Sequence, residues 1–170
     1  MKKIFLLAIL VFICMSSYAQ LITSTRVVVQ KKPSNTFWLD FGAGCLSEQY
    51  ESGLGVDLGL RWNKHFTDNV SWDIFKINAE AEVKEKLLIQ VLTGIRGTTP
   101  VLFENSTLFG AVGFGCGYIT DIEDGGFCGD MSVGINITPK FLVGIGYNFQ
   151  RVGQSNVTYN YISLKLGVKF

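Results

Sequence analysis

Residues 161–170 read Tyr-Ile-Ser-Leu-Lys-Leu-Gly-Val-Lys-Phe. Large apolar side chains alternate in this stretch with small, polar or charged ones. Because successive side chains of a β-strand point to opposite faces, a period of two predicts a strand with one apolar face and one polar face. The backbone N–H and C=O groups of a strand form their hydrogen bonds with neighbouring strands, so we expect the same pattern elsewhere in the chain. Five residues form the apolar face here: Ile162, Leu164, Leu166, Val168 and Phe170.

The same alternation recurs in seven segments upstream of this one. Residues that favour turns, mainly Gly, Asn, Asp, Ser and Pro, separate these segments. With the last segment they predict an all-β chain of eight antiparallel strands. We expect these strands to form an up-and-down transmembrane β-barrel over residues 36–170. The seven upstream segments are 37–45, 54–62, 70–83, 86–96, 107–119, 127–137 and 141–150.

The composition narrows the class of protein further. Of the 170 residues, 48% are hydrophobic, 17% are charged and 19 are glycine, and the formal net charge is +1. This low charge and high apolar content favour one folded domain over a disordered chain. A nearly neutral chain has no basic excess, so we expect no nucleic-acid partner. No apolar run reaches the roughly 20 residues that a transmembrane helix needs.

The first residues have the pattern of a secretory signal peptide. Two lysines precede an apolar run at 4–13, and the small residues Ser17 and Ala19 follow. We therefore expect a signal peptide over residues 1–19 that is cleaved after Ala19, and export from the cytoplasm. Residues 20–35 are mostly polar, and we interpret them as an N-terminal lead-in in the periplasm.

Alternation alone leaves open whether the barrel is soluble with an apolar interior or membrane-embedded with an apolar exterior. The polar face carries glycine, other small residues and a few charges, which suit the narrow interior of eight strands. Aromatic residues fall toward both ends of the segments, as two belts at two membrane–water interfaces would. We therefore expect the apolar face to contact lipid. One expected belt holds Phe37, Trp38, Trp62, Trp72, Phe109, Phe141 and Phe170, and the other holds Tyr50, Tyr118, Tyr147, Phe149, Tyr159 and Tyr161.

The last strand, with its alternating apolar residues and terminal Phe170, resembles the C-terminal strand of Gram-negative outer-membrane β-barrels. Together with the signal peptide and eight segments, the chain resembles the small outer-membrane barrels of the porin family, OmpA/OmpX type, over residues 36–170. The resemblance implies a monomer in the cell outer membrane, in contact with its lipid and with lipopolysaccharide. It also implies that the barrel-assembly machinery recognises residues 162–170. The outer loops that we predict are shorter than those of many relatives.

Charged residues on the polar face are the candidate site. Facing lipid near the midplane, each Arg or Lys would cost about 2–4 kcal/mol, so we place these residues in the lumen. Buried charges in a narrow lumen must pair to offset their desolvation. We therefore predict an interior charge network that plugs the barrel. Its members are Asp40, Asp57, Arg61, Lys76, Glu80, Arg96, Asp130 and Lys165.

Three cysteines remain after the expected cleavage: Cys45, Cys116 and Cys128. Cys116 and Cys128 flank a predicted loop at 121–126, which makes them candidates for a disulfide. They lie on different faces in the expected register, so this disulfide requires an irregular loop. A fourth cysteine, Cys14, lies inside the predicted signal peptide, where the preceding isoleucine argues against its use as a lipid acceptor.

We expect a structural or surface-interaction role for this plugged barrel. One alternative is a narrow channel, in which the interior charges form a path for protons, ions or small solutes. Another is a lipid-modifying outer-membrane enzyme, which needs a histidine beside a serine nucleophile. The single histidine, His65, lies in a predicted turn at 63–69 that contains no serine. We therefore expect no enzyme and, without zinc spacing or a phosphate loop, no metal or cofactor.

Overall fold

The computed structural model describes residues 35–48, 51–82, 87–101, 106–120, 123–153 and 158–170. The predicted signal peptide and residues 20–34 of the predicted lead-in lie outside this part, so both stay predictions. Eight strands make up most of the part described. They are β1 (Asn35–Glu48), β2 (Glu51–His65), β3 (Val70–Glu82), β4 (Leu87–Thr98), β5 (Thr107–Ile119), β6 (Asp124–Thr138), β7 (Phe141–Val152) and β8 (Thr158–Lys169).

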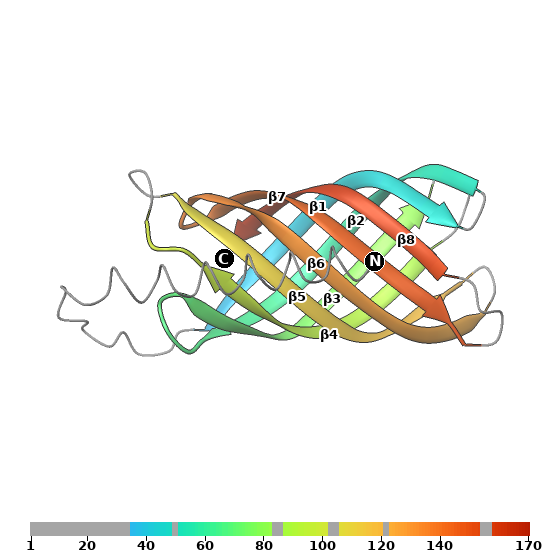
Figure 1. The fold of residues 1–170 in the computed structure, drawn as a ribbon, viewed down its shortest axis with the longest axis horizontal. Helices are drawn as coiled ribbons and strands as arrows, with labels where there is room; N and C mark the ends of the chain where they lie inside the picture. The colour runs from blue at the N-terminus through green and yellow to red at the C-terminus, as the bar shows by residue number, and fades with distance from the viewer. Residues whose placement is uncertain (1–34, 49–50, 83–86, 102–105, 121–122, 154–157) are drawn as a thin grey trace, which may run out of the picture. The chain divides into compact units, whose positions relative to one another are not determined.

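Each strand pairs antiparallel with the next, and β8 pairs with β1, which closes the barrel (Figure 1). The eight-stranded all-β barrel expected from the sequence is confirmed. Because the number of strands is even, β1 begins at the same end of the barrel at which β8 ends. We call this the termini end, and the opposite end, where β1 is followed by β2, the loop end. Among the residues described there is no helix whose length and apolar character would let it span a bilayer.

Several strands extend into residues that the sequence assigned to turns. β1 and β2 remain paired as far as Ser47 opposite Ser52 and Glu48 opposite Glu51. β6 begins at Asp124, opposite Ile119 of β5, inside the loop predicted at 121–126. Turn propensity is a weaker influence than the ladder of hydrogen bonds that a neighbouring strand offers, so pairing continues.

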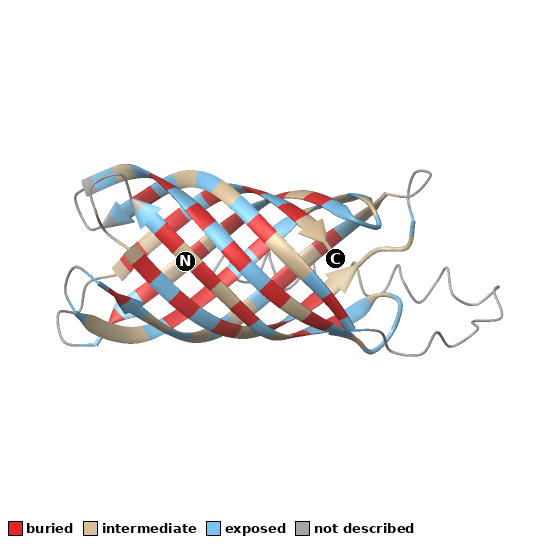
Figure 2. Ribbon diagram, turned by 180° about the vertical axis from the view of Figure 1, so that it is seen from behind, coloured by how far each residue is buried: buried red, intermediate tan, exposed pale blue. Residues whose placement is uncertain are grey.

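Buried and exposed residues alternate along the strands, and Figure 2 shows this as a checkerboard over the barrel wall. The outer face carries large apolar side chains, such as Leu58, Val133 and Leu164, each at least half exposed. The inner face carries the polar residues and many of the glycines. The assignment of the two faces from sequence is therefore confirmed.

Aromatic rings gather on the outer face near both ends of the barrel. At the termini end Phe37 stacks on Trp62 with ring centroids 5.8 Å apart, and at the loop end Phe127 lies 6.0 Å from Phe149. Part of the sequence assignment to belts was wrong, because four aromatic residues occupy strand positions of the polar face and point inward. These four are Trp38, Phe109, Tyr159 and Tyr161.

A β-bulge in β3 changes which residues face the lumen. Asp73 pairs with Gly94 and Lys76 pairs with Leu92, so Ile74 and Phe75 together stand opposite a single residue of β4. A bulge of this kind reverses the alternation along one strand. As a result Asp73 and Lys76, three positions apart, both point inward and are both buried.

Candidate functional site

The structure places all eight predicted network residues on the inner face of the barrel. Each of them is buried, with less than a tenth of its surface exposed. They come from six strands, which project them toward a common lumen because inner-face positions of a closed sheet converge. The lumen is therefore the candidate functional site, and its chemistry depends on which of these groups contact one another.

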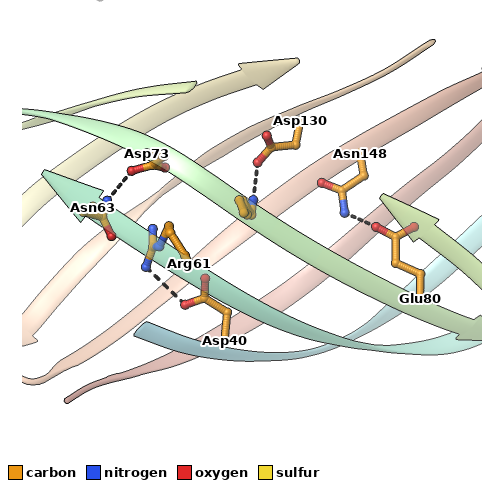
Figure 3. Close-up of polar contacts among 8 residues, drawn as sticks. Asp40, Arg61, Asn63, Asp73, Glu80, Asp130 and Asn148 are labelled. Carbon is orange, nitrogen blue, oxygen red and sulfur yellow. Dashed lines mark hydrogen bonds and ion pairs between the residues drawn. The ribbon is translucent and has the colours of Figure 1, made fainter. Parts of the chain in front are cut away.

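Two ion pairs join four of the eight residues. Arg61 of β2 donates from Nη2 to Asp40 Oδ1 of the neighbouring strand β1 at 3.2 Å. Lys76 of β3 donates from Nζ to Asp130 Oδ2 of β6, and this contact crosses the lumen (Figure 3). The first pair links strands that are already hydrogen-bonded. The second ties opposite walls of the barrel together.

Side-chain amides add further contacts across the lumen. Asn148 of β7 donates from Nδ2 to Glu80 Oε1 of β3 (Figure 3). Gln90 of β4 donates from Nε2 to Gln150 Oε1 of β7 at 3.4 Å. These amides share the polar face in the sequence pattern, but they carry no charge, so a prediction based on charged residues leaves them out.

Asp73 was also missed from sequence, because the bulge in β3 moves it to the inner face. It accepts a hydrogen bond from Asn63 Nδ2 of β2 (Figure 3). No residue type in this part of β3 marks the bulge, so the strict alternation assigns Asp73 to the outer face. Among the residues whose burial the structure describes, Asp73 is thus a fifth buried carboxylate of the network, beside those of Asp40, Asp57, Glu80 and Asp130.

Aromatic rings contact the two buried guanidinium groups. The Arg96 guanidinium lies 4.3 Å from the centroid of the Phe109 ring, and the Arg61 guanidinium lies 5.3 Å from that of Trp38. A ring face attracts a cation electrostatically and also fills space beside it. Trp38 and Phe109 therefore contact charged members of the network and also fill space in the lumen.

Inner-face glycines provide room for the buried polar groups. A methyl group added at Gly59 would lie 2.9 Å from Asn78 Oδ1, and one added at Gly167 would lie 2.5 Å from Asp40 Oδ1. Neither separation is tolerated between real atoms. The space that a larger side chain would need at each glycine is therefore already occupied by a polar group from another strand.

The described side chains leave little empty space in this part of the lumen. A cavity of about 10 Å³ has room for roughly one water molecule. Side chains from opposite walls meet here through the Lys76–Asp130 and Glu80–Asn148 contacts, so the arrangement suits a closed barrel better than an open pore. Among the residues that line this cavity are Asp40, Lys76, Arg96, Phe109, Ser132 and Lys165.

The candidate disulfide is not present in this structure. Cys116 is exposed on the outer face and Cys128 is buried on the inner face, and both thiols are free. Cys116 pairs with Phe127 and Gly115 pairs with Cys128, so the two cysteines are one residue out of register. The regular β5–β6 ladder provides no irregular segment that could bring the two sulfur atoms together.

His65 is the last residue of β2, and not part of a turn. Its Nε2 lies 3.4 Å from Thr36 Oγ1 of β1, and Ser71 is its ladder partner on β3. The fold therefore brings opposite the histidine a serine that lies outside the predicted turn at 63–69. Ser71 is buried, so its hydroxyl is not accessible to a substrate in this structure. Among the described residues, no group of three or more His, Cys, Asp or Glu is placed to hold a metal ion.

Comparison with known proteins identifies the fold. No protein-family profile and no curated protein sequence matches this chain. Among solved structures, Neisserial surface protein A is similar at a TM-score of 0.61 and 13% identity, over 82% of this chain and 100% of that one. The outer-membrane enzyme PagL is similar at a TM-score of 0.63 and 13% identity, over 77% of this chain and 98% of that one.

A third similar structure is Ail of Yersinia pestis, solved in complex with the heparin analogue sucrose octasulfate. Its TM-score is 0.50 at 13% identity, over 82% of this chain and 100% of that one. At such low identity these likenesses concern the fold alone. By its fold, the chain is a small eight-stranded β-barrel of the outer-membrane type.

Proposed function

We propose that the protein is a small integral outer-membrane barrel whose lumen is closed by its own side chains. Its role is structural or in surface interaction. The observation that carries this proposal is the pair of contacts across the lumen, Lys76 to Asp130 and Glu80 to Asn148, beside a cavity of about 10 Å³. These contacts lie across the path that a hydrated ion or small solute would take through the lumen, which supports closure.

The outer surface supports insertion into a membrane. Its strand positions expose apolar side chains around the barrel, and transfer of this surface from water to lipid is favourable. The exposed charged residues that the structure describes lie in turns or within two residues of a strand end. An apolar band therefore separates two charged rims, which is the pattern of a membrane-spanning barrel. These residues are Lys64, Asp68 and Lys140 at the termini end, and Glu123 and Arg151 at the loop end.

We also propose that the termini end faces the periplasm and that the barrel functions as a monomer in contact with outer-membrane lipid and lipopolysaccharide. The assembly signal supports this orientation. Ile162, Leu164 and Leu166 are exposed on the outer face of β8, and Phe170 is three-quarters exposed at the termini end. They are thus accessible to a periplasmic assembly machinery, and the rest of the wall is accessible to lipid.

Cell fractionation tests the membrane assignment. The protein should remain in outer membranes washed with alkaline carbonate, and unheated samples should migrate differently from boiled samples in gels. Release into the soluble fraction would refute it. Planar-bilayer recording tests closure of the lumen, with a known porin as the positive control. We expect no steady single-channel steps from the purified barrel, and their appearance would favour the channel alternative.

We propose no catalytic role for the barrel. The serine opposite His65 is buried, and the imidazole contacts a threonine hydroxyl. Mass spectrometry of the lipids from cells that express the protein should match that from cells carrying an empty vector. New lipid species that disappear in a His65→Ala variant would overturn this part of the proposal and favour the enzyme alternative.

A further inference from the structure

Six inner-face residues form a contiguous apolar cluster at the loop end of the lumen, which we call the apolar plug. Each lies within four residues of the loop end of its strand, and each is between 0% and 4% exposed. They come from five strands around the barrel, so the cluster reaches across the lumen and does not line only one wall. The six residues are Leu46 of β1, Leu88 of β4, Ile119 of β5, Val152 of β7, and Tyr159 and Tyr161 of β8.

The plug differs in chemistry from the layers next to it. The Tyr161 hydroxyl donates to the Gly55 carbonyl oxygen at 3.1 Å, so its polar group is satisfied by the wall. On the side toward the termini end, ladder positions place Gln90 and Gln150 next to it, together with Glu80 of β3, which is the ladder partner of Leu88. The ion pair between Lys76 and Asp130 lies further along the same direction.

We propose that the apolar plug is the barrier to water and ions at the loop end of the lumen, and that the contacts of the charge network close the barrel only further toward the termini end. This inference rests on the proposed closure of the lumen and says which residues exclude water and ions at its loop end. Water can replace the partners of a polar network one at a time, because charged and amide groups remain satisfied when hydrated. Water entering the plug gains no such partners, and a hydrophobic constriction excludes ions by staying dry.

Cys128 offers a native reporter for this barrier. Its thiol is free, faces the lumen and is fully buried. Its ladder partner in β7 is Gln150, which puts it just beyond the plug when viewed from the loop end. A reagent that reaches Cys128 from the loop end must therefore pass the plug but not the ion pairs. Cys45 and Cys116 face outward, so replacing both with serine leaves Cys128 as the single thiol of the barrel.

The test uses this single-thiol barrel in lipid vesicles and a charged, membrane-impermeant methanethiosulfonate reagent added outside. A separate Glu123→Cys preparation reports whether the loop end faces outward, since Glu123 is exposed there. Leu88→Ala with Ile119→Ala opens the plug, because these two residues are ladder partners in β4 and β5. Ile89→Ala is the matched control, since it removes a similar side chain from the adjacent outward position. Lys76→Met breaks the charge network.

We expect the plug variant to raise the labelling rate of Cys128 at least ten-fold, and the Ile89→Ala and Lys76→Met variants to leave it unchanged. An equal rise in the Lys76→Met variant, or no rise in the plug variant, would overturn the inference. Heat-modifiable gel mobility identifies the samples that are folded. If the double variant fails to fold, the single variant Leu88→Ala takes its place. Steady conductance of the unmodified barrel would instead refute the proposed closure, so the two failures are distinguishable.

Discussion

The ion pair between Lys76 and Asp130 gives a quantitative test of the lumen. Both side chains are almost fully buried, at 5% and 4% exposure, and the contact ties β3 to β6 across the barrel. The informative variants are Lys76→Met and Asp130→Asn, alone and together. Methionine keeps most of the lysine stem and asparagine keeps the size of aspartate, so each change removes charge with little change in volume.

The expected magnitude follows from the cost of leaving one buried charge without its partner. Removing one member of a buried ion pair typically lowers the free energy of unfolding by about 3–5 kcal/mol. Asp40 attracts Lys76 and Lys165 attracts Asp130, but Arg61 repels Lys76, so the remaining charges offset only a small part of this loss. We therefore expect each single variant to lose about 3 kcal/mol. The double variant removes both charges and should lose no more than either single variant, since no charge is then left unpaired.

Urea unfolding in detergent micelles, followed by tryptophan fluorescence, measures these differences. Lys140→Met is the matched control, because Lys140 is exposed in the turn between β6 and β7, and its loss should change stability by less than about 0.5 kcal/mol. The reasoning is refuted if the two single losses simply add in the double variant. It is also refuted if each single variant differs from wild type by less than the control.

Three further substitutions test other parts of the structure. Gly44→Ala adds a methyl group against the β8 backbone and should lower the free energy of unfolding by about 1–3 kcal/mol. The methyl group of Gly110→Ala meets open space, so this variant should change the free energy of unfolding by less than about 0.5 kcal/mol. Urea titration of both variants tests this difference. Phe109→Leu removes the ring 4.3 Å from the Arg96 guanidinium and should cost about 1–2 kcal/mol in the same assay, while wild-type stability would show that the contact contributes nothing. Phe170→Ala should reduce the heat-modifiable barrel in outer membranes several-fold without impairing refolding of purified protein in micelles, and equal assembly in cells would contradict its role as an assembly signal.

The barrel was predictable from sequence because both faces of its wall are constrained. Lipid contact requires an apolar outer face, as at Leu58 and Leu164, and a narrow lumen requires small or pairable inner residues, as at Gly59 and Lys165. A period of two therefore persists over most of the chain. The turn propensity of single residues predicted the ends of the strands less well, since Ser47 stays paired in β1 despite the preference of serine for turns.

The partners within the lumen were not predictable from the same pattern. Alternation says that Lys76 and Asp130 share the inner face, but their meeting depends on the tilt and stagger of the strands, which no single segment encodes. The bulge that turns Asp73 inward has no distinctive residue type. The inward direction of Phe109 and Tyr161 follows from their parity along the strand, whereas their aromatic character alone predicts a place in a membrane-interface belt.

The contacts across the lumen also have a consequence for folding. They join residues far apart in the chain, with separations of 54 residues for Lys76 and Asp130, 60 for Gln90 and Gln150, and 68 for Glu80 and Asn148. Such contacts form only after the intervening hairpins have been ordered. Before closure the opposite wall is not in place, so these side chains have no partner across the lumen. These contacts should therefore form last, and they should slow the unfolding of the finished barrel without speeding its formation.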